Sequence, residues 1–281
     1  MRAHLKEVIS ASRRTDMPAY YLDRLICFIQ QGFAEVRNPF SGKKYSVSLL
    51  PENVHTLVLW SKDFKYFLEK STYFKDYNLY FLFTINDMPY LEPGIPDLED
   101  RLEQLDELAV RYGPERIAWR YDPVVFKSNE PVSDIETFSQ IGERIVHAGV
   151  TRTIFSFLDM YGKVKKRNEK LKLHLIDPPV EVKIEYAAKL AGIADTLDLS
   201  LECCCEDIED IKGISASSCI NGHLLSRLAG EPANLIKDSG QRKACNCTVS
   251  RDIGSYYEMP CPGGCLYCYA NPQIELFQGV S

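Results

Sequence analysis

The segment LYFLFTINDMPYLEPGIPDLEDRLEQLDELAVRYGPERIAWRYDP (79–123) reads as a strand, a helix and a second strand. LYFLFTI (79–85) is a short run of aromatic and aliphatic residues, which is typical of a buried strand. PDLEDRLEQLDELAVRYG (96–113) repeats apolar residues at helical spacing, and RIAWRYDP (116–123) is again strand-like. Two strands joined through a helix by short connections indicate a parallel unit of an α/β protein.

The same alternation extends along the chain in both directions. Further strands are predicted at 7–12, 55–60, 152–159 and 195–204, and helices at 19–33, 64–74 and 133–149. Six such units in order favour a parallel barrel or an open doubly wound sheet. We expect the barrel: an α/β fold of TIM-like (β/α) type in residues 1–240, with a cysteine-rich iron–sulfur segment, residues 241–281, packed on its rim.

Alternation within the strands predicts which side chains face the interior of the barrel. The leucines of DTLDLSLECC (195–204) share one parity and are expected to pack on the outer helices. Glu202 and Cys204 have the other parity and should face inward. The same argument directs Arg120 and Asp122 inward.

Charged residues cluster where the predicted strands end. Arg13, Arg14 and Asp16 follow the first strand, and Arg120 and Asp122 end the strand at 116–123. In α/β barrels such strand ends meet on one rim, where active sites are built. The arginines suit a carboxylate or phosphate, which the two aspartates would orient. The catalytic candidates are therefore Arg13, Asp16, Arg120 and Asp122, and the cofactor-binding candidates on this rim are Arg14 and Glu202.

Composition and charge narrow the class of protein. The chain has 281 residues, of which 45% are hydrophobic and 26% charged, as in an ordinary globular protein. The net charge of −6 argues against a general attraction to nucleic acid or to an anionic membrane, although the basic stretch GKVKKRNEKLKLH (162–174) leaves a local contact open. Neither a membrane helix nor a secretory signal is evident, so we expect a cytoplasmic protein with no membrane partner.

Cysteine usage is unusual for a protein expected in a reducing compartment. Nine of the ten cysteines lie between Cys203 and Cys268, and metal binding is the leading explanation. The motif CPGGCLYC carries the triad Cys261, Cys265 and Cys268. A structural zinc site needs four ligands, whereas three thiolates fit a 4Fe-4S cluster that leaves one iron open.

The remaining cysteines leave two alternatives open. Cys245 and Cys247 form a CxC pair, and with Cys219 they could hold a second cluster or a zinc ion. One of the pair could instead give the triad a fourth ligand, which would remove the open iron. The run Cys203–Cys205 is expected mainly to pack as core, since adjacent strand residues face opposite ways.

The triad, with Tyr267 just before its last cysteine, resembles the signature of the radical S-adenosylmethionine superfamily. GCLYCYA (264–270) is similar to the branch that contains spore photoproduct lyase. The resemblance implies that the three thiolates hold a 4Fe-4S cluster, that its unique iron chelates S-adenosylmethionine, and that Tyr267 lies near the adenine. It also implies an electron donor such as a ferredoxin or flavodoxin. In that superfamily the triad follows the first strand of the barrel, whereas here it follows the last predicted unit.

A wider resemblance covers nearly the whole chain. ISASRRTDMPAYY (9–21), LWSKD (59–63), WRYDP (119–123) and IKDSGQRKACNC (236–247) are similar to the family catalogued as domain of unknown function 1848. That resemblance implies a barrel-type fold with a cysteine-rich C-terminus and no established substrate.

Two classes of function follow. The first is an iron–sulfur enzyme of radical S-adenosylmethionine type that acts on a small anionic or polar molecule, with nucleic acid repair as a specialised case. The second is a non-radical barrel protein whose C-terminal cysteines hold an iron–sulfur or zinc centre with a structural or electron-transfer role.

Overall fold

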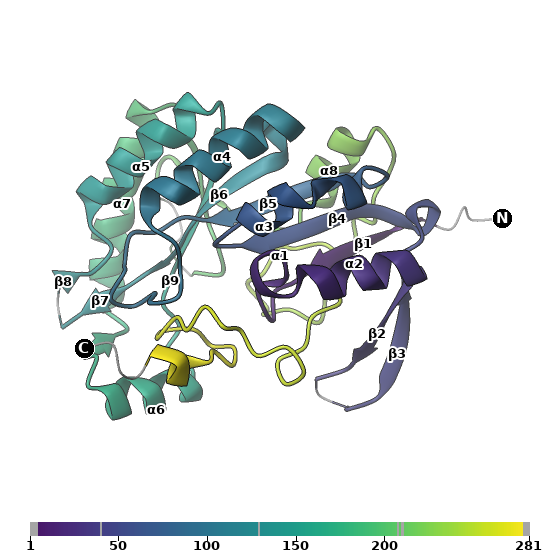
Figure 1. Cartoon of the computed structure of the whole chain (residues 1–281). Helices are drawn as coiled ribbons and strands as arrows, with labels where there is room; N and C mark the ends of the chain where they lie inside the picture. Colours follow the sequence, from purple (N-terminus) through teal and green to yellow (C-terminus); the bar gives the residue numbers. More distant parts are fainter. Residues whose placement is uncertain (1–4, 40, 129, 207, 209–210, 278–281) are drawn as a thin grey trace.

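The computed structural model describes residues 5–39, 41–128, 130–206, 208 and 211–277, and a parallel sheet of eight strands forms its centre (Figure 1). The strand order is β12-β11-β9-β6-β5-β4-β1-β13. The strands are β1 (Glu7–Ala11), β4 (Val54–Ser61), β5 (Leu79–Thr84), β6 (Ile117–Val124), β9 (Arg152–Phe157), β11 (Ser200–Cys203), β12 (Ile214–Ala216) and β13 (Arg251–Asp252). Each neighbouring pair in this sheet is parallel, which confirms the predicted α/β class.

The two strands β4 and β5 lie in the middle of the sheet. Every residue of both is buried, because protein covers both faces of the sheet there. Near-continuous apolar runs are typical of such strands. The predicted runs 55–60 and 79–85 coincide with them.

Helices cover one face of the sheet. They are α1 (Met17–Tyr20), α2 (Leu22–Gln31), α3 (Lys65–Glu69), α4 (Leu98–Tyr112), α5 (Ile135–His147) and α7 (Val180–Thr196). Leu199 and Leu201 belong to the apolar core on this face, so their predicted outward parity is confirmed. Within the described residues, no helix combines the length and the apolarity needed to cross a bilayer.

The opposite, inner face carries a second core. Side chains from the strands, such as Val58, Leu82 and Ile154, meet Ile220 and Leu225 there. Leu225 belongs to α8 (Gly222–Ala229), which follows β12. The inner face is therefore covered by the chain between β12 and β13 rather than by a helix from each strand–helix unit.

No closed barrel is detected in the described part of the chain, because β12 and β13 form opposite ends of the strand order. Both strands are only two or three residues long. The segment after β12 and the segment before β13 are joined by hydrogen bonds between loops. Thr248 N donates to the Ile220 carbonyl at 2.9 Å, and the Ser218 hydroxyl donates to the Asn246 carbonyl at 2.9 Å. In a closed barrel, β12 and β13 would pair through backbone hydrogen bonds, and here these loop contacts take the place of that pairing.

Three smaller elements surround the sheet. A β-hairpin consists of β2 (Phe33–Arg37) and β3 (Lys44–Ser48), which are antiparallel. A second small sheet joins β7 (Phe126–Lys127), β8 (Glu130–Pro131) and β10 (Leu175–Ile176). The helix α6 (Gly162–Leu171) lies beside the C-terminal segment, drawn in yellow in Figure 1.

Asp252 fastens the last strand to the first. Its carboxylate accepts hydrogen bonds from the hydroxyls of Ser10 at 2.9 Å and Ser12 at 2.8 Å. It also accepts from the backbone N–H groups of Arg13 at 2.8 Å and Gly254 at 3.0 Å. One buried side chain thus fixes the end of β1 and the start of the cysteine-bearing loop together.

Replacing this carboxylate should destabilise the fold. We expect Asp252→Ala to lower the free energy of unfolding by about 2 kcal/mol, because four donors lose their acceptor in a buried place. Urea denaturation followed by circular dichroism measures the change. Asp76→Ala, at an exposed position, is the matched control and should shift stability by less than about 0.5 kcal/mol. Equal stability of the two variants would contradict this role of Asp252.

Candidate functional site

A cavity of about 600 Å³ opens at the carboxyl ends of the strands. Its walls come from residues at or just after the ends of β1, β4, β5, β6, β9 and β11, together with the cysteine-rich segment. The sequence-predicted site residues that line it are Arg13, Arg14, Asp16, Arg120, Asp122, Cys219, Cys245, Cys247, Cys261, Cys265, Tyr267 and Cys268. The structure therefore brings nearly all of the candidates to one place.

Glu202 is the candidate that is not among the residues lining the cavity. Both of its carboxylate oxygens accept from the guanidinium of Arg152, at 2.8 and 2.7 Å. Arg152 also donates to the Tyr80 hydroxyl at 2.6 Å and to the Ser218 carbonyl at 2.7 Å. This bidentate pair ties β11 to β9 and to the chain after β12, which is a structural connection on the inner face.

The triad loop is held in place by hydrogen bonds to three other parts of the chain. The Tyr21 hydroxyl donates to the Pro260 carbonyl at 2.6 Å, and the Tyr269 hydroxyl donates to the Arg13 carbonyl at 2.7 Å. Arg167 of α6 donates to two backbone carbonyls of the loop at 2.9 and 2.7 Å. The loop that follows β13 is thereby placed over the end of β1.

The two glycines of CPGGCLYC allow the tight path of this loop. Gly264 has φ +64°, a left-handed conformation that glycine adopts without steric cost. A Cβ on Gly263 would lie 3.2 Å from both the Tyr20 hydroxyl and the Ile95 side chain. Larger residues at either position would push the flanking cysteines away from the cavity.

Cys265 is buried, Cys261 and Cys268 are half-buried, and the thiols of Cys261 and Cys265 both interact with Cys268. Burial raises the pKa of Cys261 to about 12, and it raises the pKa values of Cys265 and Cys268 as well. The Lys62 ammonium opposes this rise at Cys265 and Cys268, and the Ala270 N–H donates to Cys268 Sγ at 3.4 Å. A cation and an N–H group thus lie where they stabilise the thiolate forms of these cysteines.

Five other cysteines form a second group, which we call the five-cysteine ring: Cys204, Cys205, Cys219, Cys245 and Cys247. Cys204 Sγ lies 3.7 Å from Cys205 Sγ and 3.9 Å from Cys219 Sγ. The Cys205 thiol also influences the pKa of Cys245, Cys245 that of Cys247, and Cys247 that of Cys219, so the five thiols form one interacting group. Cys203, by contrast, packs in the outer core, so the alternation predicted for this run holds at Cys203 and Cys204.

Two arginines stack on one indole at the wall of the cavity. The guanidinium groups of Arg13 and Arg120 lie 5.1 and 5.0 Å from the ring centroid of Trp60. Arg120 also pairs with Asp122, which accepts from the Ser156 hydroxyl. Four of these side chains line the cavity with charge or with a polar group, as expected of a site for an anionic or polar ligand.

Asp16 is a buried carboxyl group at the N-terminus of α1. Burial raises its pKa to about 6, although it accepts from Lys62 N at 2.9 Å, from the Ser61 hydroxyl at 2.7 Å and from Ala19 N at 3.1 Å. It also lies close enough to Cys261 to raise the pKa of that thiol. Its position links the end of β1, the end of β4 and the triad.

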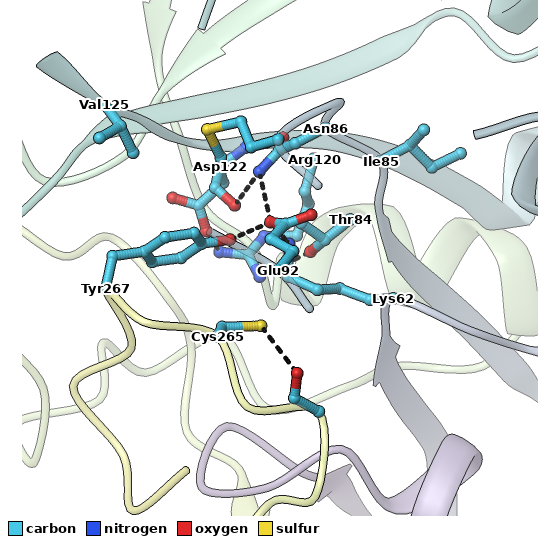
Figure 2. A network of polar contacts seen from close by, with 12 residues as sticks. Lys62, Thr84, Ile85, Asn86, Glu92, Arg120, Asp122, Val125, Cys265 and Tyr267 are labelled. Atoms are coloured by element: carbon cyan, nitrogen blue, oxygen red, sulfur yellow. Dashed lines mark hydrogen bonds and ion pairs between the residues drawn. The ribbon is translucent and has the colours of Figure 1, made fainter. Parts of the chain in front are cut away.

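Lys62, Glu92 and Tyr267 form a buried network at the cavity wall (Figure 2). Lys62 Nζ lies 2.8 Å from Glu92 Oε1, and the Tyr267 hydroxyl donates to the same oxygen. The Glu92 side chain is 2% exposed. Burial raises the pKa of Glu92, but Lys62 and Tyr267 together outweigh burial and lower it.

Sequence reasoning missed part of this arrangement. Glu92 lies in the connection between β5 and α4, where no periodic pattern marks it as buried. Cys204 and Cys205 were expected mainly as core, and only the inward parity of Cys204 pointed to the cavity. In the part of the chain that the structure describes, no group of three or more His, Cys, Asp or Glu side chains is arranged to hold a metal ion as it stands.

Comparison with known proteins gives one match. The model of a family described as "Domain of unknown function (DUF1848)" matches residues 8–270, which is most of the chain. No curated protein matches the sequence.

Removing Lys62 should destabilise the fold because the buried carboxylate of Glu92 loses its cation. We expect Lys62→Met to lower the free energy of unfolding by about 3 kcal/mol at pH 7.5, since Glu92 is then buried without its cation. Without Lys62 the pKa of Glu92 rises, so protonation relieves the loss as the pH falls toward 5.

In the unchanged protein, the pair of Lys62 and Glu92 has the opposite dependence of stability on pH. The folded pKa of Glu92 lies below its unfolded value, so the pair stabilises the fold above the unfolded pKa and this contribution disappears as the pH falls through the folded pKa. Denaturation at several pH values measures both behaviours, and the Lys62→Met, Glu92→Gln double variant is the control that should recover stability. A loss that is equal at pH 5 and pH 7.5 would show that Glu92 is not responsible.

Proposed function

The chain belongs to the family described as Domain of unknown function (DUF1848), and from this premise we propose that it is an iron–sulfur enzyme of radical S-adenosylmethionine type. The observation that carries the proposal is the position of Cys261, Cys265 and Cys268, which face a charged cavity at the carboxyl ends of a parallel sheet. The proposed substrate is a small anionic or polar molecule.

The spatial order of the strands supports the resemblance better than the order along the chain does. In the radical S-adenosylmethionine superfamily the triad follows the first strand, and in this chain it follows β13. Because β13 pairs with β1 at one end of the sheet, the spatial order is β13-β1-β4-β5-β6-β9. With β13 taken as the first strand, each following neighbour comes in chain order, which is the order that a circular permutation of the superfamily's fold would produce.

The residues of the triad loop fit a cluster held by three thiolates. Cys245 and Cys247 interact with other members of the five-cysteine ring. The triad thiols interact with Asp16, Lys62, Glu92, Arg167 and Asp122, and Cys261 and Cys265 also interact with Cys268. This separation favours three thiolate ligands over a site closed by the CxC pair. When bound, a 4Fe-4S cluster would supply an open iron for S-adenosylmethionine and an electron for its reductive cleavage.

The chain's own residues would then bind and orient the molecules in the cavity. The guanidinium groups of Arg13, Arg14 and Arg120 are suited to hold a carboxylate or phosphate. Asp122 would orient a hydroxyl or amino group, and Asp16 can exchange a proton near neutral pH because its pKa is raised to about 6 by burial. Tyr267 is expected beside the adenine, and a ferredoxin or flavodoxin is the proposed electron donor.

The second candidate function is a protein with a metal centre that performs no radical chemistry. The short sulfur–sulfur distances of the five-cysteine ring favour some thiolate-bound metal independently of the triad. A zinc-only protein, colourless when purified without air and unable to take up iron and sulfide, would favour this alternative.

Anaerobic reconstitution tests the proposed activity. With iron, sulfide, dithionite and S-adenosylmethionine, we expect 5′-deoxyadenosine to form, and Cys265→Ala to reduce the product at least about tenfold by removing a cluster ligand. Cys27→Ala is the matched control, because Cys27 is exposed on α2 and should leave product and iron content unchanged. Absence of 5′-deoxyadenosine from a protein that retains iron and sulfide would overturn the proposal.

A further inference from the structure

We propose that the five-cysteine ring is a second metal centre, separate from the triad, that binds one Zn²⁺ ion through four of its thiolates and fastens the two edges of the sheet. The proposal does not depend on the activity proposed above. It rests on the spacing of the sulfurs, on the segments that supply them and on the charges around them.

The two sulfur–sulfur distances at Cys204 match those around a single tetrahedral ion. Zinc–thiolate bonds of about 2.3 Å place neighbouring sulfurs of a tetrahedral site about 3.8 Å apart. The two distances at Cys204, 3.7 Å to Cys205 and 3.9 Å to Cys219, lie on either side of that value. A cubane cluster places each thiolate on a different iron, so its sulfurs stand farther apart than those around one ion.

The ring draws its cysteines from both edges of the open sheet. Cys204 and Cys205 follow β11, and Cys219 follows the edge strand β12. Cys245 and Cys247 precede the opposite edge strand, β13. The ring therefore joins the segments beside the two edge strands, and an ion shared by these segments would add a metal–ligand connection to the loop hydrogen bonds and apolar contacts that already link them.

The surroundings of the ring suit a negatively charged metal–thiolate group. The guanidinium groups of Arg13, Arg120 and Arg242 all act on its sulfurs. The Ile220 N–H donates to Cys247 Sγ at 3.4 Å, which is the kind of backbone contact that stabilises bound thiolates. All five cysteines also line the cavity, so an ion can reach them.

The ring must contract to bind the ion. Cys204 Sγ lies within 3.9 Å of two other sulfurs, and the thiols of Cys205, Cys245, Cys247 and Cys219 influence one another's pKa in turn, whereas a tetrahedron uses four ligands that all contact one another. Side-chain rotation would bring four sulfurs together and leave the fifth thiol free. Single substitutions should therefore separate four essential cysteines from one that can be replaced.

The test uses the full chain with the triad removed by Cys261→Ala, Cys265→Ala and Cys268→Ala. We expect this protein to retain about one zinc ion per chain by elemental analysis, and Co²⁺ in its place to give intense thiolate charge-transfer absorption. Adding Cys219→Ala or Cys247→Ala should reduce bound zinc at least about tenfold and lower the midpoint of thermal unfolding. Cys203→Ala is the matched control, because its thiol packs in the outer core next to the ring.

Two outcomes would overturn the proposal: no bound zinc or cobalt in the triad-free protein, or iron with sulfide in place of zinc. If the triad-free protein fails to fold, the same comparison is made in the chain that retains the triad. There Cys219→Ala should remove zinc and leave the iron content unchanged, and unchanged zinc would reject the second centre. Loss of 5′-deoxyadenosine formation with zinc retained would count against the radical activity alone.

Discussion

The position of the triad depends on the parallel pairing of β13 with β1 and on the carboxylate of Asp252. Because neighbouring strands run parallel, the chain that leaves β13 emerges at the same edge as the chain that leaves β1. Asp252 accepts hydrogen bonds from both chains and holds them in register. Without this connection, residues separated by about 240 positions, such as Arg13 and Asp252, would not share one cavity.

The cavity combines groups that are costly to bury alone. Buried carboxylates, guanidinium groups and thiols each lose hydration, and each is compensated locally: Glu92 by Lys62, Asp122 by Arg120, and the five-cysteine ring by three arginines. Removing one partner of such a buried pair leaves an uncompensated charge in the interior, which strongly destabilises the fold. The wall is therefore preorganised around charges, which is the condition under which an enclosed site can bind a polar ligand with a defined orientation.

The sequence predicted the class of fold and the residues of the rim because both follow from local patterns. Buried parallel strands are continuous apolar runs, and strand alternation correctly placed Leu201 on the outer face and Arg120 on the inner face. Closure of the sheet was not predictable in this way, since it depends on whether two- and three-residue edge strands meet. The five-cysteine ring was missed for a related reason, because its cysteines come from three distant segments and become neighbours only through tertiary contacts. Glu202 was assigned to the site because strand alternation predicts which face a side chain lies on but does not reveal that Arg152 binds it.

The order of the strands has a consequence for synthesis of the chain on the ribosome. β1 is made first and can pair with β4 early, yet its other edge stays without a neighbour until residues 251 and 252 have emerged. An open edge of this kind is a template for wrong pairing with another nascent chain. One edge of β1 therefore stays unpaired while the roughly 240 residues between β1 and β13 are made, and β13 is the strand that covers it.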